Sequence, residues 1–205
     1  MMANPNLEHE IRLWLAGYGA IAGLDEAGRG ALAGPVAAGA VVLPKGVGLA
    51  GIWAEVRDSK LLSAVKREEM AVRIRREAAG WGVGEASAQE IDAIGIAPAT
   101  RLAMQRALAA LPLRPDYLLL DWVRLATVNL PQDSFTKGDR RIVSIAAASI
   151  LAKVYRDGLL VEVDRLYPAY GFAAHKGYGA ASHLAAIATH GPCPEHRMSF
   201  SPMRG

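Results

Sequence analysis

Four acidic residues lie at points where a carboxylate is costly unless something compensates it. Asp25 and Glu26 come directly after the apolar run that begins at residue 20. Asp121 ends the apolar run YLLL, and Asp139 precedes a long helical pattern. Carboxylate oxygens are the ligands that Mg²⁺ and Mn²⁺ prefer. If the four side chains converge, they form a site for two divalent cations, which can activate water against a phosphodiester.

Each acid also has a purely structural interpretation. Asp139 is favourable at a helix N-terminus, and Asp121 is a common turn residue. For these two residues taken singly, the structural interpretation is the better one. Asp25 and Glu26 differ, because no strand propensity explains two acids after an apolar run. Adjacent strand residues point to opposite faces, so we expect the strand to end or bend at Asp25.

The glycines at 28, 30 and 34 have two interpretations. A dinucleotide-binding fingerprint needs a helix after the turn, whereas GPVAAGAVVL at 34–43 predicts a strand. The turn then either brings bare backbone and Arg29 against a phosphate-bearing substrate or is an ordinary tight turn with Arg29 paired to an acid. The residues alone leave these two alternatives open.

Composition indicates a folded protein that tolerates a polyanionic partner. The chain has 205 residues, of which 52% are hydrophobic and 21% charged, with a net charge of +3. The one cysteine excludes an internal disulfide and suits a reducing compartment. The N-terminal residues are charged and lack a long apolar core, and no window is long enough to span a bilayer. We expect a cytoplasmic protein without a membrane partner.

Hydrophobic periodicity predicts strands that alternate with helices. Strands are expected at 20–25, 34–43, 81–89 and 115–121. Helices are expected at 6–19, ending at Gly17 or Gly19, and from 64 with Ser63 as N-cap. Further helices are expected across 91–111 with a break near Pro98, at 140–167, where Gly158 could bend the helix, and near 180–189. This order is typical of an α/β fold. We divide the chain into an N-terminal helical extension, 1–19, and one domain, 20–205, that includes a helical C-terminal lobe.

Six segments of the chain resemble one family. DEAGRGALAGPV at 25–36 resembles the opening motif of type 2 ribonuclease H, the bacterial ribonuclease HII. Further matches come in the same order, at DSKLLS (58–63), LLLD (118–121), KGDRRIVSIAAASILAKVYRD (137–157), YGFAAHKGYGAASH (170–183) and GPCPEHRMSF (191–200). Six ordered motifs are far more specific than any one of them.

The resemblance implies a ribonuclease H-like mixed sheet flanked by helices, with a helical C-terminal part. It implies an endonuclease that hydrolyses the RNA strand of RNA–DNA hybrids and nicks DNA 5′ of embedded ribonucleotides. The expected mechanism uses two ions, Mg²⁺ or Mn²⁺, and leaves a 5′-phosphate and a 3′-hydroxyl. The family's catalytic and metal-binding acids correspond to Asp25, Glu26, Asp121 and Asp139. The expected partners are hybrids and ribonucleotide-containing duplexes, bound by a monomer.

The resemblance also assigns contacts to nucleic acid. The backbone of Gly28, Arg29 and Gly30 is expected to read the ribose 2′-hydroxyl, the group that distinguishes RNA from DNA. Tyr178 is expected to pack against the nucleotide next to the cut. Without the family, Tyr178 is better read as a half-buried aromatic in a glycine-rich loop.

Lys60, Ser149 and Lys153 correspond to positions that touch phosphates. Ser149 and Lys153 are four residues apart and share a helix face, next to small alanines. The alternative is a small-residue packing face from which Lys153 extends to solvent. For Lys60 alone, a solvated loop lysine is the simpler interpretation.

Three positions depart from the family pattern. Ala31 stands where we expect Pro, Leu61 where we expect Lys, and Trp122 where we expect Gly. Leu61 removes one possible phosphate contact. Trp122 is the most consequential, because a bulky side chain directly after the third acid could crowd the site or re-aim Asp121.

Two other functions remain as alternatives. A non-catalytic module that binds RNA–DNA hybrids would not need four acids, which repel a polyanion in the absence of metal. A nucleotide-cofactor enzyme requires a helix directly after Gly34. A zinc site is disfavoured because the histidines fit no helical metal-binding spacing, so we expect hydrogen-bonding roles for them.

Overall fold

The computed structural model describes residues 4–204, so residues 1–3 and 205, the outer ends of the two expected segments, lie outside it. In chain order, the helices and strands are α1 (Glu8–Leu15), β1 (Ile21–Ala27), β2 (Val36–Val42), α2 (Ile52–Glu55), α3 (Ala64–Glu77), β3 (Gly80–Ala86), α4 (Ala88–Ile94), α5 (Ile96–Ala109), β4 (Tyr117–Asp121), β5 (Gln132–Phe135), α6 (Val143–Leu166), α7 (Phe172–His175) and α8 (Ala181–His190). Short 3₁₀ turns at Ser59–Leu61, Gly138–Arg140 and Pro168–Tyr170 complete the order.

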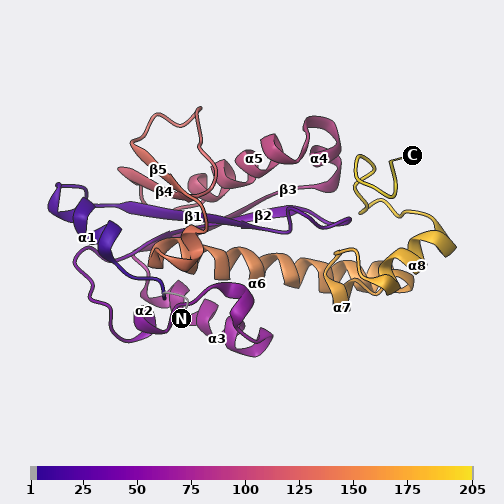
Figure 1. Cartoon of the computed structure of the whole chain (residues 1–205), viewed down its shortest axis with the longest axis horizontal. Coiled ribbons are helices and arrows are strands. Elements are labelled where there is room, and N and C mark those ends of the chain that lie inside the picture. Colours follow the sequence, from indigo (N-terminus) through magenta and orange to yellow (C-terminus); the bar gives the residue numbers. More distant parts are fainter. Residues whose placement is uncertain (1–3, 205) are drawn as a thin grey trace.

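The five strands form one mixed sheet in the order β3-β2-β1-β4-β5. The first three strands pair antiparallel, and β4 and β5 join parallel to β1. Helices cover both faces, with α5 and α4 on one side and α6, α3 and α2 on the other (Figure 1). This arrangement confirms the α/β class and the ribonuclease H-like mixed sheet.

Glycines in β1 and β2 let α6 lie unusually close to the sheet. A Cβ atom at Gly23 would come within 2.3 Å of the Ser144 carbonyl carbon, and one at Gly39 within 2.3 Å of the Ala148 carbonyl oxygen. The alanines at 146–148 and 152 are fully buried in the same contact. The stripe of small residues seen in the sequence is therefore a packing face of α6.

The helical C-terminal lobe packs against the far end of α6, where α7 and α8 follow it (Figure 1). It has a small core of its own, formed by Ala33, Leu160, Tyr170, Phe172, Ala186 and Cys193. At the other end, α1 adds Leu7, Leu13 and Trp14 to the core between α6 and the sheet. Among residues 4–204, no helix is both long and apolar enough to cross a membrane.

The structure corrects three expected boundaries. β1 does not end at Asp25 but runs to Ala27, because β2 continues the antiparallel ladder past that point. The helical break lies at Gly95, with φ of 84°, rather than at Pro98, which falls in the first turn of α5. The four-residue strand β5 was not predicted from its mostly polar sequence, QDSF.

Other expectations are confirmed. Ser63 caps α3, its hydroxyl accepting a hydrogen bond from the Lys66 amide. The residues after Gly34 form the strand β2, which excludes the helix that a dinucleotide fingerprint requires. The long helix expected at 140–167 forms in one piece as α6, with no break at Gly158.

We predict that Gly23→Ala destabilises the protein by about 1–3 kcal/mol, because the new methyl group meets helix backbone that has nowhere to move. Urea denaturation followed by circular dichroism measures the change. Gly48→Ala is the matched control: Gly48 is exposed, and its added Cβ meets no atom within 4 Å. Equal stability of the two variants would contradict the close approach of α6.

Candidate active site

The four predicted acids lie around the ends of the two central parallel strands. Asp25 and Glu26 are neighbours in β1, just beyond the last pair that β1 makes with β4, Leu24 with Leu120. Asp121 is the last residue of β4, and Asp139 lies in the 3₁₀ turn before α6. Burial raises the pKa of both Asp25 and Glu26, and Asp121 is close enough for its charge to raise them further.

Electrostatics shows that the acids form one cluster. Burial, and then the charges of Glu26 and Asp121, raise the pKa of Asp25 well above its usual range. Burial is also the main cause that raises the pKa of Glu26 to about 7. The pKa of Asp121 is raised by burial and by Asp139, and that of Asp139 by burial and by Asp58. A cluster that resists ionisation in this way is complementary to cations.

The positive charge of Lys60 partly compensates the negative charge of the acid cluster. Its ammonium lies 3.8 Å from Asp139 Oδ2. Burial lowers the pKa of Lys60, but the charges of Asp139, Asp58, Asp25 and Asp121 outweigh it and raise the pKa overall. Because the Lys60 side chain is 74% exposed, it is free to leave when another cation or a phosphate arrives.

The acids suit hard divalent cations in their donor chemistry. Glu26 Oε2 is buried and has no hydrogen-bond partner. Such an orphaned carboxylate oxygen is costly unless a ligand uses it. Within residues 4–204, no three Asp, Glu, His or Cys side chains already converge on one ion position. The acids are close enough to influence one another's pKa, but their oxygens do not yet converge on one point. Ion binding therefore requires some of their side chains to adjust.

Trp122 fills the space above Glu26. The indole Nε1–H donates a 2.8 Å hydrogen bond to Glu26 Oε1. The Arg29 guanidinium lies over the indole ring, 3.8 Å from its centroid. Asp121, the neighbour of Trp122, separately accepts a 2.8 Å hydrogen bond from the Gly138 amide. The bulky residue thus contacts Glu26 and Arg29.

Two buried arginines hold the glycine turn. Arg197 donates to the carbonyls of Gly28, Arg29 and Gly34 at 2.8–3.0 Å. Arg156 donates to the carbonyls of Ala33, Pro35 and Lys176 at 2.8–2.9 Å. A Cβ at Gly28 would lie 1.8 Å from Arg156 Nε, and its φ is 87°, so only glycine fits there. Gly30 has open space around it, which leaves its backbone accessible.

The loop that carries Tyr178 is tied to the same turn. The Gly177 carbonyl accepts from the amides of Leu32 and Ala33. Tyr178 is exposed, and its ring lies 5.5 Å from Lys153 Nζ and 5.4 Å from the Arg156 guanidinium. The residue is thus presented beside the glycine turn rather than packed in a core.

Two buried histidines, His183 and His196, support the loop that carries Tyr178. His196 Nδ1 accepts from the Cys193 amide, so its Nε2 carries the proton of the neutral ring. That Nε2–H donates to His183 Nε2 at 3.0 Å, and His183 Nδ1–H donates to the Tyr178 carbonyl at 2.9 Å. Burial lowers the pKa of both histidines and favours the neutral pair. The predicted hydrogen-bonding role is confirmed for these two.

A cleft of about 440 Å³ runs between these parts. Its walls include most of the predicted contact residues, namely Glu26, Gly28, Arg29, Lys60, Ser149, Lys153 and Tyr178, together with Ser59. The Ser59 and Ser149 hydroxyls are 3.0 Å apart. A groove lined by two lysines, two hydroxyls and the Glu26 carboxylate, which links it to the acid cluster, fits a phosphodiester chain.

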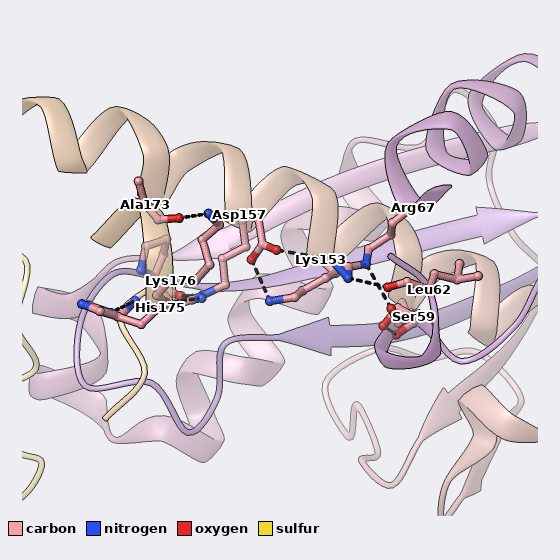
Figure 2. A network of polar contacts seen from close by, with 12 residues as sticks. Ser59, Leu62, Arg67, Lys153, Asp157, Ala173, His175 and Lys176 are labelled. Carbon is pink, nitrogen blue, oxygen red and sulfur yellow. Dashed lines mark hydrogen bonds and ion pairs between the residues drawn. The ribbon is translucent and has the colours of Figure 1, made fainter. Parts of the chain in front are cut away.

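A charged network behind the cleft fixes Lys153. Lys153 Nζ donates to Asp157 Oδ1 at 2.7 Å, and Arg67 lies 3.5 Å from Asp157 Oδ2. Figure 2 shows Lys153 and Arg67 pointing toward Asp157, while Arg67 also reaches the carbonyls of Ser59 and Leu62. In the sequence, Arg67 is typical of a solvated helix face. Only the fold shows that it joins α3 and the Ser59 turn to α6.

Comparison with known proteins identifies the family. A family profile described as Ribonuclease HII matches residues 22–203. The chain belongs to the ribonuclease HII family. Ribonuclease HII of Geotalea daltonii is 52% identical over 195 residues, which cover 95% of this chain and 88% of that protein. Ribonuclease HII of Syntrophotalea carbinolica is 53% identical over 198 residues, covering 97% and 93%. The chain is therefore a metal-dependent ribonuclease H, an endonuclease acting on RNA–DNA hybrids.

Solved structures share the fold. Ribonuclease H2 from Pyrococcus horikoshii OT3 has a TM-score of 0.76 at 24% identity, covering 90% of this chain and 95% of that one. RNase HII from Archaeoglobus fulgidus, in its complex with PCNA, has a TM-score of 0.71 at 25% identity, covering 88% and 95%. Bst-RNase HIII in complex with Mn²⁺ has a TM-score of 0.65 at 18% identity, covering 90% and 68%.

We predict that Glu26 makes the metal-free protein less stable as pH rises from about 4.5 to about 7, whereas the buried His183 and His196 act in the opposite direction. In this range folded Glu26 keeps a proton that the unfolded chain, with a pKa of 4.5, has lost. At this group the folded state therefore binds more protons, and its contribution to the free energy of unfolding falls with rising pH. Urea denaturation in chelator at several pH values measures the slope for the wild type and for Glu26→Gln. The wild type should lose stability relative to the variant as pH rises through this range; equal slopes would contradict the assignment.

Proposed function

We propose that this member of the family also nicks duplex DNA 5′ of a single embedded ribonucleotide. The observation that carries the proposal is the arrangement of one cleft. Glu26, a member of the acid cluster, lines this cleft together with Gly28, Arg29 and Tyr178. A site that only had to bind a polyanion would not gather four carboxylates there. This argument also disfavours the alternative of a non-catalytic hybrid-binding module.

In this proposal Asp25, Glu26, Asp121 and Asp139 hold two divalent cations, Mg²⁺ or Mn²⁺. When bound, the cations supply charge neutralisation at the scissile phosphate and activation of the attacking water. The carboxylates fix and orient them, and no covalent enzyme intermediate is needed. The products are a 5′-phosphate and a 3′-hydroxyl. We further propose that the protein acts as a monomer in the cytoplasm.

The remaining residues bind and orient the duplex. Lys60, Ser149 and Lys153 contact phosphates along the cleft. The carbonyls of Gly28 and Arg29 already accept from Arg197, which fixes the turn, and the exposed backbone at Arg29 and Gly30 would read a ribose 2′-hydroxyl. Tyr178 packs against the nucleotide at the RNA-to-DNA step. These roles rest on the family resemblance together with the positions of the side chains.

We predict that Asp25→Asn lowers cleavage of a duplex with one ribonucleotide about a thousandfold or more, because cation ligation contributes several kcal/mol to such reactions. Cleavage is measured by gel electrophoresis with Mg²⁺, with Mn²⁺ and with chelator. Asp133→Asn, at an exposed ion pair with Arg12, is the control and should cut normally. A folded wild type that binds this duplex and a long hybrid but cuts neither would reject catalysis.

We predict that Tyr178→Ala lowers nicking at a single ribonucleotide about tenfold, since base stacking on an aromatic contributes about 1–3 kcal/mol. Cleavage within a long hybrid should fall less, because it has no RNA-to-DNA step. The comparison of kcat/KM for the two substrates measures the difference. Tyr155→Phe, away from the cleft lining, is the control. An equal loss on both substrates would argue against junction recognition by Tyr178.

A further inference from the structure

Trp122 occupies a backbone conformation that its residue type disfavours. Its φ is 44°, in the left-handed region where bulky residues are uncommon. Such conformations persist where surrounding contacts enforce them, and they cluster at functional sites. Only three residues other than glycine have a positive φ in the described part of the chain: Trp122, Lys137 and Lys176. Trp122 directly follows Asp121, so the strained peptide adjoins the acid cluster.

The indole of Trp122 lies between the Glu26 carboxylate and the Arg29 guanidinium. The ring edge donates its N–H to Glu26 Oε1, while the other oxygen of that carboxylate, Oε2, is buried without a partner. The ring face carries the Arg29 guanidinium at 3.8 Å. One side chain therefore contacts both a member of the acid cluster and the turn that borders the substrate cleft.

We propose that Trp122 is a positioning residue, which holds Glu26 so that Oε2 faces a divalent cation and holds Arg29 against the substrate cleft. The inference rests on the proposed cation site. A carboxylate with one oxygen fixed by a donor loses a rotamer choice before the ion binds. Donors behind metal ligands commonly change metal affinity 10- to 100-fold.

The two contacts are separable by substitution. Trp122→Phe removes the N–H donor and keeps a ring face for Arg29. Trp122→Gly removes both contacts and accepts the left-handed φ without strain, so it should fold. If Trp122 only filled space, removal of its N–H in Trp122→Phe would leave Mn²⁺ affinity unchanged.

The test is equilibrium Mn²⁺ binding, measured by electron paramagnetic resonance of free Mn²⁺ without nucleic acid. Trp122→Phe and Trp122→Gly should each raise the Mn²⁺ dissociation constant about tenfold. Glu26→Gln sets the scale for loss of the carboxylate. Trp81→Phe is the matched control, because Trp81 also lies under an arginine, Arg75 at 5.2 Å, outside the cleft.

Duplex binding in chelator tests the second contact, by fluorescence anisotropy with a labelled duplex containing one ribonucleotide. Trp122→Gly should weaken it about two- to fivefold, the range expected of an exposed cation–π pair, and Trp122→Phe should change it less. Circular dichroism melting confirms that each variant is folded.

The outcomes separate this inference from the proposed function. Loss of Mn²⁺ affinity in Glu26→Gln but not in Trp122→Phe overturns the role of Trp122 and leaves the cation site intact. Unchanged affinity in both overturns both. Weaker Mn²⁺ binding in Trp122→Phe, with a wild type that cuts no ribonucleotide-containing duplex, supports the role of Trp122 and rejects the proposed nicking activity.

Discussion

The close approach of α6 to β1 and β2 is the constraint on which the site depends. Gly23 and Gly39 leave room for helix backbone where any side chain would collide with it. The same helix then brings Ser149 and Lys153 to the cleft and Arg156 to the glycine turn, and its start fixes the position of Asp139. A shift of this helix would move Ser149, Lys153 and Arg156 together, because one rigid element carries all three.

Burial and charge are balanced differently in two parts of the site. Arg156 and Arg197 are fully buried, and backbone carbonyls rather than carboxylates accept their hydrogen bonds. Burial lowers the pKa of both guanidiniums, to about 9 for Arg197. In the acid cluster, by contrast, the negative charges of the carboxylates exceed the positive charge nearby. The two buried arginines therefore bind loop carbonyls and do not neutralise the carboxylates. The carboxylates remain available to cations from solvent.

Local patterns in the sequence predicted most elements, whereas features that depend on tertiary contacts were missed. Strand and helix positions and the Ser63 cap come from periodicity and capping chemistry, and the six ordered motifs marked the acids. Nothing local showed that β1 continues past Asp25, because β2 supports that extension. Arg67 resembled a solvated residue, and nothing in the sequence singled out Arg156 and Arg197, because their carbonyl partners are distant in sequence. Trp122 was recognised as a departure, but its partners required the fold.

The glycine turn and its restraints lie at opposite ends of the chain. Residues 28–34 are made early, yet Arg197 holds three of their carbonyls, and the Glu195 carbonyl accepts from the Gly34 amide. Proteins are synthesised from the N-terminus, so the contacts that Glu195 and Arg197 make with this turn can form only after the sheet and α6 have been synthesised. The glycine turn therefore gains its full set of hydrogen bonds only once residues 195 and 197 have been added.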